Sequence, residues 1–376
     1  MKNSMSSYTE NEMVIGMDGF PFSKQQGGIG KYLLAILSML VDTYPQAKIL
    51  LFSNKPIFLP AELEDRVTRV CAAKGYMKLP TTVWLKCFAG RLINQYKLDC
   101  YISTGGLLPS GKLSCPTLSV VHDLVYKLFP KSMGRLQYYS HAFFLKHDVE
   151  KATAVICNSM GTASRVVETF GVEPSGIVCP PIHPRYYKKE CRDDKTVLEK
   201  YGIDSPYFLS VGTLEPRKNL SMTIRVFASL VSRGALGGHK LVLVGAKGWR
   251  NNEIVSLCEA YSKDIFRLGY VPDEDLPSLY KHATAFLFPS LYEGFGIPVR
   301  EAMMCGCPVL TSDSPELKES SLGLATYINP NDKSQYEEAL LSLVASSRQG
   351  PALNERMIAS DFSSILQFID SLKEAK

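Results

Sequence analysis

The most informative stretch of this 376-residue chain is Phe288-Pro289-Ser290-Leu291-Tyr292-Glu293-Gly294-Phe295-Gly296-Ile297-Pro298-Val299-Arg300-Glu301-Ala302. It ends an apolar run typical of a buried strand, crosses a glycine-rich turn and enters a helix whose first position suits Pro298. Glu293 is therefore expected in the loop and Glu301 in the first helical turn. Because ligands of parallel sheets bind beyond the strand ends, both carboxylates should face a cleft, with the amides of Gly294–Gly296 free to bind an anion.

A purely structural explanation of the two glutamates stays open beside this one. Glu301 would interact with the helix dipole and Glu293 would be an ordinary loop acid, each worth at most about 1 kcal/mol. That explanation gives no reason for the aromatic and glycine residues between the two acids.

Short apolar runs alternate with longer mixed segments on both sides of this stretch, which indicates βαβ units. Three prolines in Cys179–Pro184 and the charged segment Lys188–Lys195 interrupt the pattern and place a linker near residues 180–195. The chain after Ser334 is expected to be helical. The expected strands are Met13–Met17, Lys48–Phe52, Val67–Val70, Cys100–Ser103, Thr117–Val121 and Ala154–Cys157, then Tyr207–Val211, Lys240–Val244, Ile265–Leu268, Ala285–Phe288, Pro308–Ser312 and Ala325–Ile328.

Composition excludes several classes of protein. Hydrophobic residues make up 45% and charged residues 21%, as in soluble globular proteins. No apolar run approaches the roughly 18 residues of a membrane span, and the polar start lacks a signal-peptide core, so we expect a cytoplasmic protein. The ten scattered cysteines fit free thiols. Residues 1–185 hold 20 Lys+Arg against 13 Asp+Glu, which suits an anionic surface or acceptor, but no basic run indicates nucleic acid.

Two motifs of the first half follow expected strands. Gly27-Gly28-Ile29-Gly30-Lys31-Tyr32 opens a helix, where glycine backbone and free N–H groups suit a phosphate. It is neither a Walker loop nor a dinucleotide fingerprint, and a simple flexible turn is the alternative. Val120-Val121-His122-Asp123 ends a strand in a histidine that could bind a sugar hydroxyl or transfer a proton. The alternative there is a helix-capping Asp123 beside a structural His122.

The motif Gly212-Thr213-Leu214-Glu215-Pro216-Arg217-Lys218-Asn219 follows the first strand of the second half. Arg217 and Lys218 are adjacent cations at a helix start, a pairing that suits a diphosphate. A solvated helix start is the plainer alternative.

Taken together, these motifs resemble retaining glycosyltransferases of the group 1 kind, family 4 in the sequence classification. The resemblance covers nearly the whole chain, and the family motif of two glutamates separated by seven residues fits Glu293 and Glu301. It implies the α/β GT-B fold, with two Rossmann-like parallel-sheet domains facing across a cleft. These would be an acceptor-side domain 1–187, a nucleotide-sugar domain 188–355, and a helix in 356–376 that packs back on the first domain. The further matching segments are Gly27–Gly30, His122, Ala154–Ser159, Glu215–Asn219 and Gly269–Pro272.

The resemblance also implies roles for single residues around a nucleoside diphosphate sugar. Glu301 would hold the ribose hydroxyls, Glu293 would lie close to the transferred sugar, and Arg217 and Lys218 would neutralise the departing diphosphate. The other implied contacts are Gly28 and Gly30 with the phosphates, His122 near the anomeric carbon, Tyr270 with the base, and Gly294, Phe295 and Gly296 with sugar or phosphate.

The family needs neither a cofactor nor a metal, so none is expected here. Asp273-Glu274-Asp275 has the form of a metal-binding triplet but is interpreted as an acidic helix start. The family's frequent arginine after the phosphate-strand glycine is Thr213 here, which leaves the contact of Arg217 open. No carboxylate is placed as a nucleophile, so we expect attack by the acceptor hydroxyl on the same face, assisted by the departing phosphate.

The resemblance is to mannosyltransferases of surface-polysaccharide assembly, carried by Glu215–Asn219, and it favours GDP-mannose over other nucleoside diphosphate sugars. The acceptor would be a glycan or lipid-linked glycan.

A basic, aromatic segment could lie on the anionic inner face of the membrane, or could be a helix packed on the core. A sugar-nucleotide epimerase of GT-B shape and a non-catalytic binding protein are the alternative functions; no dinucleotide glycine pattern supports an oxidoreductase. That basic segment comprises Lys78, Trp84, Leu85, Lys86, Phe88, Arg91 and Leu92.

Overall fold

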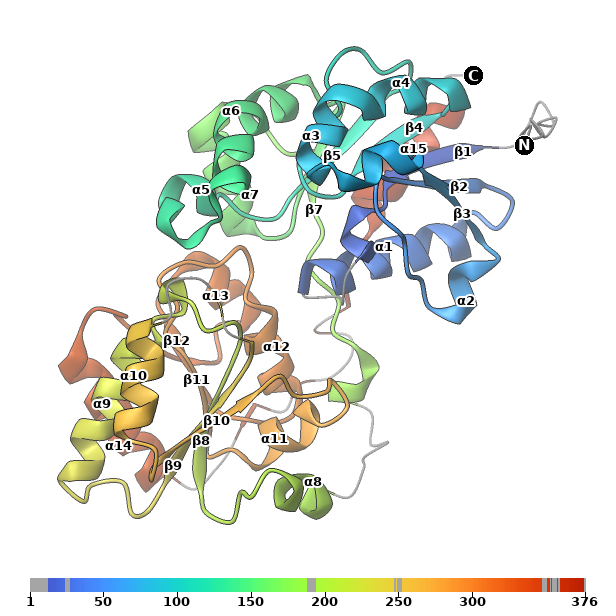
Figure 1. Cartoon of the computed structure of the whole chain (residues 1–376). Helices are drawn as coiled ribbons and strands as arrows, with labels where there is room; N and C mark the ends of the chain where they lie inside the picture. Colours follow the sequence, from blue (N-terminus) through green and yellow to red (C-terminus); the bar gives the residue numbers. More distant parts are fainter. Residues whose placement is uncertain are drawn as a thin grey trace.

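The computed structural model describes residues 13–23, 28–187, 194–246, 248, 252–346, 350–351, 353, 357 and 359–374. Within them the chain forms two α/β domains, each built on a parallel sheet (Figure 1). The expected domain limits at 187/188 and 355/356 each involve residues outside this description, so these limits stay predictions.

The first sheet has seven parallel strands in the order β3-β2-β1-β4-β5-β6-β7. The strand order reverses between β1 and β4, and ligands of open sheets bind where this happens. Asp18 ends β1 and Thr104 follows β4, so these two residues meet at the reversal. The strands are β1 Val14–Asp18, β2 Lys48–Ser53, β3 Val67–Cys71, β4 Cys100–Ser103, β5 Thr117–Val121, β6 Ala154–Cys157 and β7 Gly176–Ile177.

The second sheet has six parallel strands in the order β10-β9-β8-β11-β12-β13. Its reversal lies between β8 and β11, whose following loops carry Arg217 and Glu293. The topology therefore brings together two motifs that are far apart in the sequence. The strands are β8 Tyr207–Val211, β9 Lys240–Val244, β10 Ile265–Gly269, β11 Ala285–Phe288, β12 Val309–Ser312 and β13 Thr326–Ile328.

Helices cover the sheets and connect the parallel strands. In the first domain they are η1 Phe20–Ser23, α1 Gly28–Thr43, α2 Ala61–Glu64, η2 Lys74–Lys78, α3 Thr81–Trp84, η3 Leu85–Ala89, α4 Gly90–Ile93, η4 Asn94–Tyr96, α5 Val125–Leu128, η5 Pro130–Ser132, α6 Arg135–Lys151 and α7 Met160–Phe170. The remaining helices are η6 Pro184–Tyr186, α8 Asp194–Lys200, η7 Pro216–Lys218, α9 Leu220–Ser232, α10 Asn252–Ala260, α11 Leu276–His282, α12 Ile297–Met304, α13 Pro315–Ser320, α14 Lys333–Ala345 and α15 Ser363–Glu374.

The last helix, α15, packs back on the first domain, as expected. Its Ile365 and Ile369 are fully buried in the same apolar cluster as Ile36 and Ile156 of the first domain. The hydroxyl of Tyr44 on the loop after α1 also donates to Asp370 at 3.0 Å. In Figure 1 the C-terminus therefore lies beside the N-terminal domain rather than the C-terminal one.

The twelve expected strands are all present, and no limit differs by more than one residue. The sequence reasoning missed only β7, a strand of two residues with no apolar run of its own. It also placed Glu301 one turn too early, because α12 begins at Ile297 and Glu301 is its fifth residue.

The centre of the basic segment, Trp84–Lys86, packs on the core, which was the alternative to membrane contact, whereas Lys78 and Arg91 are exposed. Trp84 and Leu85 are buried in the apolar cluster of the first domain. The Lys86 ammonium is buried too; it pairs with Asp148 and donates to the carbonyl oxygen of Leu108 at 2.7 Å. These side chains are therefore unavailable to a lipid surface. None of the helices in the described ranges is long and apolar enough to cross a membrane.

Candidate active site

Glu293 forms the centre of a charged cluster at the strand reversal of the second sheet. Its Oε1 lies 2.7 Å from the Lys218 ammonium, and its Oε2 lies 3.0 Å from Nη1 of Arg217. Arg217 Nη2 also donates to Glu215 at 2.6 Å. A backbone bond of 2.9 Å from Leu291 N–H to the Arg217 carbonyl oxygen ties the two loops together. Three of the four expected site charges are thus in direct contact.

The cluster keeps its charges although it is buried. Burial by itself would raise the pKa of Glu293, but the neighbouring Lys218 and Arg217 lower it to about 2. Burial lowers the pKa of Lys218, and the carboxylate of Glu293 opposes that effect. Burial acts on Arg217 in the same direction, but Glu293 and Glu215 outweigh it and raise the pKa of Arg217. Glu293 is therefore ionised at neutral pH and holds two cations in fixed positions.

Glu301 lies elsewhere, in a cavity between the two domains. This Glu301 cavity has a volume of about 690 Å³, and Lys31 of α1 lines it from the first domain, with Tyr270 on the opposite side. The Tyr280 hydroxyl donates to Glu301 Oε2 at 3.3 Å. Burial raises the pKa of Glu301, and the charge of Lys31 opposes the rise. Glu301 and Tyr270, which the resemblance places at the ribose and the base, line this one cavity, apart from the cluster around Glu293.

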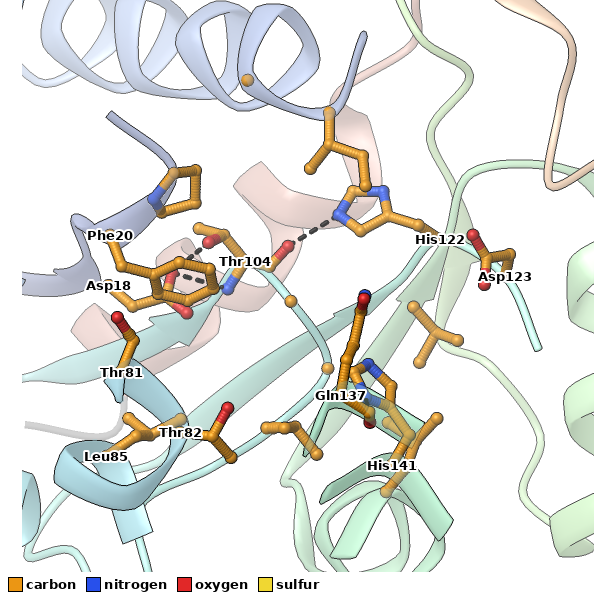
Figure 2. A pocket seen from close by; sticks show the side chains of 18 of the residues that line it. Asp18, Phe20, Thr81, Thr82, Leu85, Thr104, His122, Asp123, Gln137 and His141 are labelled. Carbon is orange, nitrogen blue, oxygen red and sulfur yellow. Dashed lines mark hydrogen bonds between the residues drawn. The ribbon is translucent and has the colours of Figure 1, made fainter. Parts of the chain in front are cut away.

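Gly28, Gly30 and His122 line a second cavity, here called the His122 cavity, of about 520 Å³. All its lining residues belong to the first domain, and Figure 2 shows most of them around the open space. A Cβ added at Gly28 would come within 3.3 Å of Ile297, so the glycine lets α1 approach the start of α12. Gly27 lies outside the described residues.

The His122 ring is held by the backbone of the same edge. Its Nε2 lies 2.6 Å from the Thr104 carbonyl oxygen, which can only accept, so Nε2 carries the proton. Burial lowers the pKa of the imidazole, and the ring is neutral with its lone pair on Nδ1. Asp123 accepts from Val125 N–H at 3.0 Å, but the N-cap of α5 is Leu124, so the N-cap role considered for Asp123 is wrong.

The loop of Glu293 is pressed against the first domain. Gly294 lies so close to the His122 carbonyl oxygen that an added Cβ would be only 2.0 Å from it. The Gly294 carbonyl oxygen accepts from the Ser159 hydroxyl at 2.6 Å, and the Tyr292 hydroxyl accepts from Leu124 N–H at 2.8 Å. These contacts hold the residues on either side of Glu293 against the first domain, with Gly294 next to the His122 backbone.

Two glutamates of α13 strengthen this interface. Met160 N–H, at the first turn of α7, donates to Glu319 at 2.7 Å, and Arg165 pairs with the fully buried Glu316 at 2.7 Å. Carboxylates at a helix N-terminus are favoured by the free N–H groups and the helix dipole. Sequence reasoning did not identify this interface.

Comparisons with known proteins agree with this geometry. Residues 193–360, which contain Arg217, Lys218, Tyr270 and both glutamates, match the family model of glycosyl transferases group 1. The match covers less than half of the chain and includes the whole charged cluster around Glu293.

Similar proteins extend the match beyond this domain. O-antigen chain mannosyltransferase B of Escherichia coli is 31% identical over 229 residues, which cover 60% of this chain and 59% of that protein. Serotype-specific mannosyltransferase WbdA of Escherichia coli is 25% identical over 233 residues, 60% of this chain and only 29% of WbdA. O-antigen chain mannosyltransferase RfbU of Salmonella typhimurium is 28% identical over 260 residues, 68% of this chain and 69% of RfbU. The chain therefore spans less than two thirds of the first two relatives.

Solved structures establish the fold of the whole chain. WaaG, described as a glycosyltransferase involved in lipopolysaccharide biosynthesis, has a TM-score of 0.68 at 17% identity over 96% of this chain and 95% of its own. Sucrose-phosphate synthase from Thermosynechococcus elongatus has the same TM-score at 16% identity, again over 96% and 95%. The chain has the GT-B fold, as the sequence predicted.

The acidic triplet of the group 1 domain is split among three partners. Asp273 pairs with Lys31 at 2.7 Å, Glu274 with Arg185 at 3.4 Å, and Asp275 with Lys200 at 2.6 Å. The three carboxylates are thus engaged separately, and no group of three or more potential metal ligands occurs in the part of the chain that the structure describes.

Sequence reasoning missed two residues that line the cavities of the candidate site. Lys31 follows the expected glycine loop, but nothing in the sequence indicated that it would cross to Asp273. Asp18 ends the first strand and lines the His122 cavity. An acid at the carboxyl end of the first strand, beside the strand reversal, is a signal that could have identified Asp18.

Gly294→Ala should prevent the domains from closing, because the new methyl group would overlap the His122 carbonyl oxygen. Small-angle X-ray scattering should show a larger radius of gyration than for the wild-type protein, with the far-UV spectrum unchanged. Gly75→Ala is the matched control, since an added Cβ at Gly75 has no neighbour within 4 Å. Equal radii for all three proteins would contradict the assigned closure.

Proposed function

We propose that the protein is a retaining glycosyltransferase that moves a hexose from a nucleoside diphosphate sugar to a glycan or lipid-linked glycan in surface-polysaccharide biosynthesis. The observation that carries the proposal is the buried cluster in which Glu293 holds Arg217 and Lys218 against the first domain, inside the matched group 1 domain. The mannosyltransferase names of the similar proteins favour mannose, with GDP-mannose as donor.

The chemistry follows from these charges. The bond between the anomeric carbon and the diphosphate oxygen breaks, while a bond forms between that carbon and an acceptor hydroxyl on the same face. The acceptor proton goes to the departing phosphate oxygen. Negative charge grows on the diphosphate, and Arg217 and Lys218 stabilise it from positions fixed before the donor binds. No metal ion takes part in this proposal.

Glu293 and His122 would hold the transferred sugar. Glu293 would accept hydrogen bonds from sugar hydroxyls, since it remains ionised between its two cations. The neutral His122 offers Nδ1 as an acceptor on the facing domain. The closed contact between Gly294 and the His122 backbone excludes water that would otherwise hydrolyse the donor.

The Glu301 cavity would take the nucleoside. Its buried carboxylate would accept hydrogen bonds from the two ribose hydroxyls, and the backbone around Tyr270 would contact the base. The pyrophosphate would extend from there to Lys218. On this path it would contact Gly28 and Gly30 of the first domain. From the second domain it would meet the backbone amides of Gly294, Phe295 and Gly296. Lys31 at the wall of the cavity adds positive charge along this path.

The two other functions predict different products. A sugar-nucleotide epimerase would convert the donor with no acceptor present. A binding protein would take up the nucleotide sugar without turnover, although the fixed cluster around Glu293 favours catalysis.

The donor is tested by thermal unfolding with a panel of UDP, GDP and ADP sugars, each with its free nucleotide. GDP-mannose should raise the melting temperature most, because a ligand at 100 times its Kd stabilises the folded state by about 2.7 kcal/mol. Incubation of the stabilising donor with and without glycan acceptors then distinguishes transfer from epimerisation. A larger shift with a UDP sugar would refute the assignment of GDP-mannose.

The roles of the charged cluster are tested by two substitutions. Glu293→Ala should leave GDP affinity largely intact while transfer falls by about 100-fold or more, because the sugar loses its positioning group. Lys218→Ala should weaken GDP binding by about tenfold or more in calorimetry, because a hydrogen bond to a charged phosphate is lost. The exposed Glu338→Ala and Lys263→Ala are the matched controls. Equal loss of binding and transfer in Glu293→Ala would contradict its role.

Peripheral membrane contact is proposed for a surface on α5 and α6. Leu136, Tyr139 and Phe143 are 52%, 53% and 72% exposed and share one face of α6, with Leu128 of α5 also exposed. The exposed cations around them are Lys127, Lys131, Arg135 and Lys146. Exposed apolar side chains can insert at a membrane surface, and neighbouring cations are attracted to anionic lipid headgroups. The other side of α6 lines the His122 cavity with His141 and Leu145, so a lipid-linked acceptor could reach it from there.

The double substitution Tyr139→Ser with Phe143→Ser should reduce flotation with phosphatidylglycerol vesicles at least several-fold, because two aromatic rings would no longer be buried in the lipid on binding. Neutral phosphatidylcholine vesicles should float little protein in either case. Phe58→Ser is the matched control, since Phe58 is an exposed aromatic outside this surface. Wild-type protein that stays unbound on anionic vesicles would refute membrane contact.

A further inference from the structure

Lys86 and Asp148 form an ion pair inside the first domain. Their side chains are only 6% and 4% exposed, and the Lys86 ammonium also lies 4.6 Å from the centroid of the Phe144 ring. Burial lowers the pKa of Lys86, and the hydrogen bond to Asp148 opposes that effect. Because both charges lose their water, apolar side chains of similar volume are often as stable as such a pair or more so. Stability alone therefore gives little reason for an ion pair here.

Both members of the pair bind the backbone of Leu108. The Leu108 N–H donates to Asp148 Oδ2 at 2.9 Å, and the Lys86 ammonium donates to the Leu108 carbonyl oxygen at 2.7 Å. The same Oδ2 also accepts from Lys86. These three residues are here called the Leu108 clamp. Apolar side chains could fill the space of the pair, but they could not bind the two polar backbone groups of Leu108.

The Leu108 clamp joins three segments that form walls of the His122 cavity. Lys86 belongs to η3, Asp148 to α6, and Leu108 to the loop after β4. Each segment also contributes an apolar residue to the cavity wall. Figure 2 shows residues of all three segments around the same open space. A change in the clamp therefore affects the shape of the whole cavity. The three apolar wall residues are Leu85, Leu107 and Leu145.

The loop after β4 connects Leu108 to Thr104 and is held at several points. The carbonyl oxygens of Gly106 and Leu107 accept hydrogen bonds from serine hydroxyls at 3.2 and 2.8 Å. Gly106 has a φ of +79°, and an added Cβ would lie only 2.8 Å from a methyl carbon of Leu145 on α6. The loop is thus packed tightly on the helix that carries Asp148. A shift of Leu108 would therefore be transmitted to Thr104.

Thr104 in turn holds His122. Its carbonyl oxygen accepts from His122 Nε2 at 2.6 Å. Its N–H donates to Oδ1 of Asp18 at 2.9 Å, and its hydroxyl donates to the same oxygen. Burial raises the pKa of Asp18 to about 7 and lowers the pKa of His122. A displaced Thr104 would weaken the hydrogen bond that keeps the imidazole proton on Nε2.

We propose that Lys86 and Asp148 are positioning residues for His122: they hold the backbone of Leu108 and thereby fix the loop whose Thr104 orients the imidazole ring. The proposal rests on the proposed glycosyltransferase function for the use of the ring in catalysis, but the state of the ring can be measured without turnover. A charged pair suits this role because it binds an N–H and a carbonyl oxygen of one residue in fixed directions, inside a medium of low dielectric constant.

Two double substitutions test the path through Leu108. The first, Lys86→Met with Asp148→Leu, fills the space with apolar side chains, which proteins often tolerate in place of a buried pair, but it removes both contacts to Leu108. The second, Lys86→Met with Asp148→Asn, also removes both charges but retains an oxygen for the Leu108 N–H. Arg69→Met with Glu64→Leu is the matched control, because it removes an exposed ion pair of the first domain.

The ring of His122 is observed by NMR on the full chain labelled with ¹⁵N-histidine. The chain has six histidines, and the signal that disappears in His122→Gln is that of His122. Exchange of its Nε2 proton with water should be about five- to tenfold faster in the first double variant than in wild-type protein, the usual effect of losing one hydrogen bond. The second double variant should lie between these two, and the control should match the wild type.

Turnover and GDP binding are measured on the same proteins. With the donor identified by thermal unfolding, kcat of transfer should fall about five- to tenfold in the first double variant, because a reacting group is misplaced by one lost hydrogen bond. The Kd for GDP should stay unchanged, since the clamp lies in the other domain from Arg217 and Lys218. A purely structural pair would change the melting temperature without changing either kcat or the ring.

The result that would overturn the proposal is a first double variant with the His122 signal, proton exchange and kcat of the wild type. If that variant does not fold, the second one decides: faster exchange than in the control supports the proposal, and equal exchange overturns it. Altered exchange without transfer by wild-type protein would leave the positioning role and remove the glycosyltransferase. Transfer by wild-type protein with unchanged kcat in both double variants would leave the enzyme and remove the positioning role.

Discussion

The ionised carboxylate of Glu293 is the constraint on which the site depends. Two cations on adjacent residues would repel one another inside a protein, and each would lose the water that stabilises it. One carboxylate between them offsets both costs, provided that the loops after β8 and β11 are held together. The strand order of the second sheet supplies that condition. The cluster is therefore a product of topology as well as of sequence.

The same principle of adjacent strands explains the first domain. There the reversal brings the end of β1 to the loop after β4, and Thr104 holds Asp18 and His122 through its own backbone and hydroxyl. The two reversals face each other across the Gly294 contact. One edge carries fixed positive charge and the other carries neutral or weakly acidic groups. The two sheet edges that face each other in the closed molecule therefore differ in charge.

Most of the fold could be predicted because parallel strands, buried on both faces, appear as continuous apolar runs. β7 was not predicted because its two residues do not form an apolar run. The pairing of Glu293 with Arg217 and Lys218 was predictable from motifs after strands, but the orientation of Glu301 on α12 was not. Glu301 points away from Glu293 because α12 turns it toward Tyr280, and helix rotation is set by packing against the neighbours. Trp84 and Lys86 show the same limit: their pattern suited a membrane, but Trp84 packs in the apolar core and Lys86 pairs with Asp148, which is distant in sequence.

The crossing of α15 back to the first domain affects how the protein is made. Ile365 and Ile369 complete a core whose other members are all synthesised before residue 180. During translation the N-terminal domain leaves the ribosome with a groove in its core, and it stays unfinished until about half of the chain has followed. The second domain has no such dependence and can fold as soon as its strands emerge. The domain that begins the chain is thus completed last.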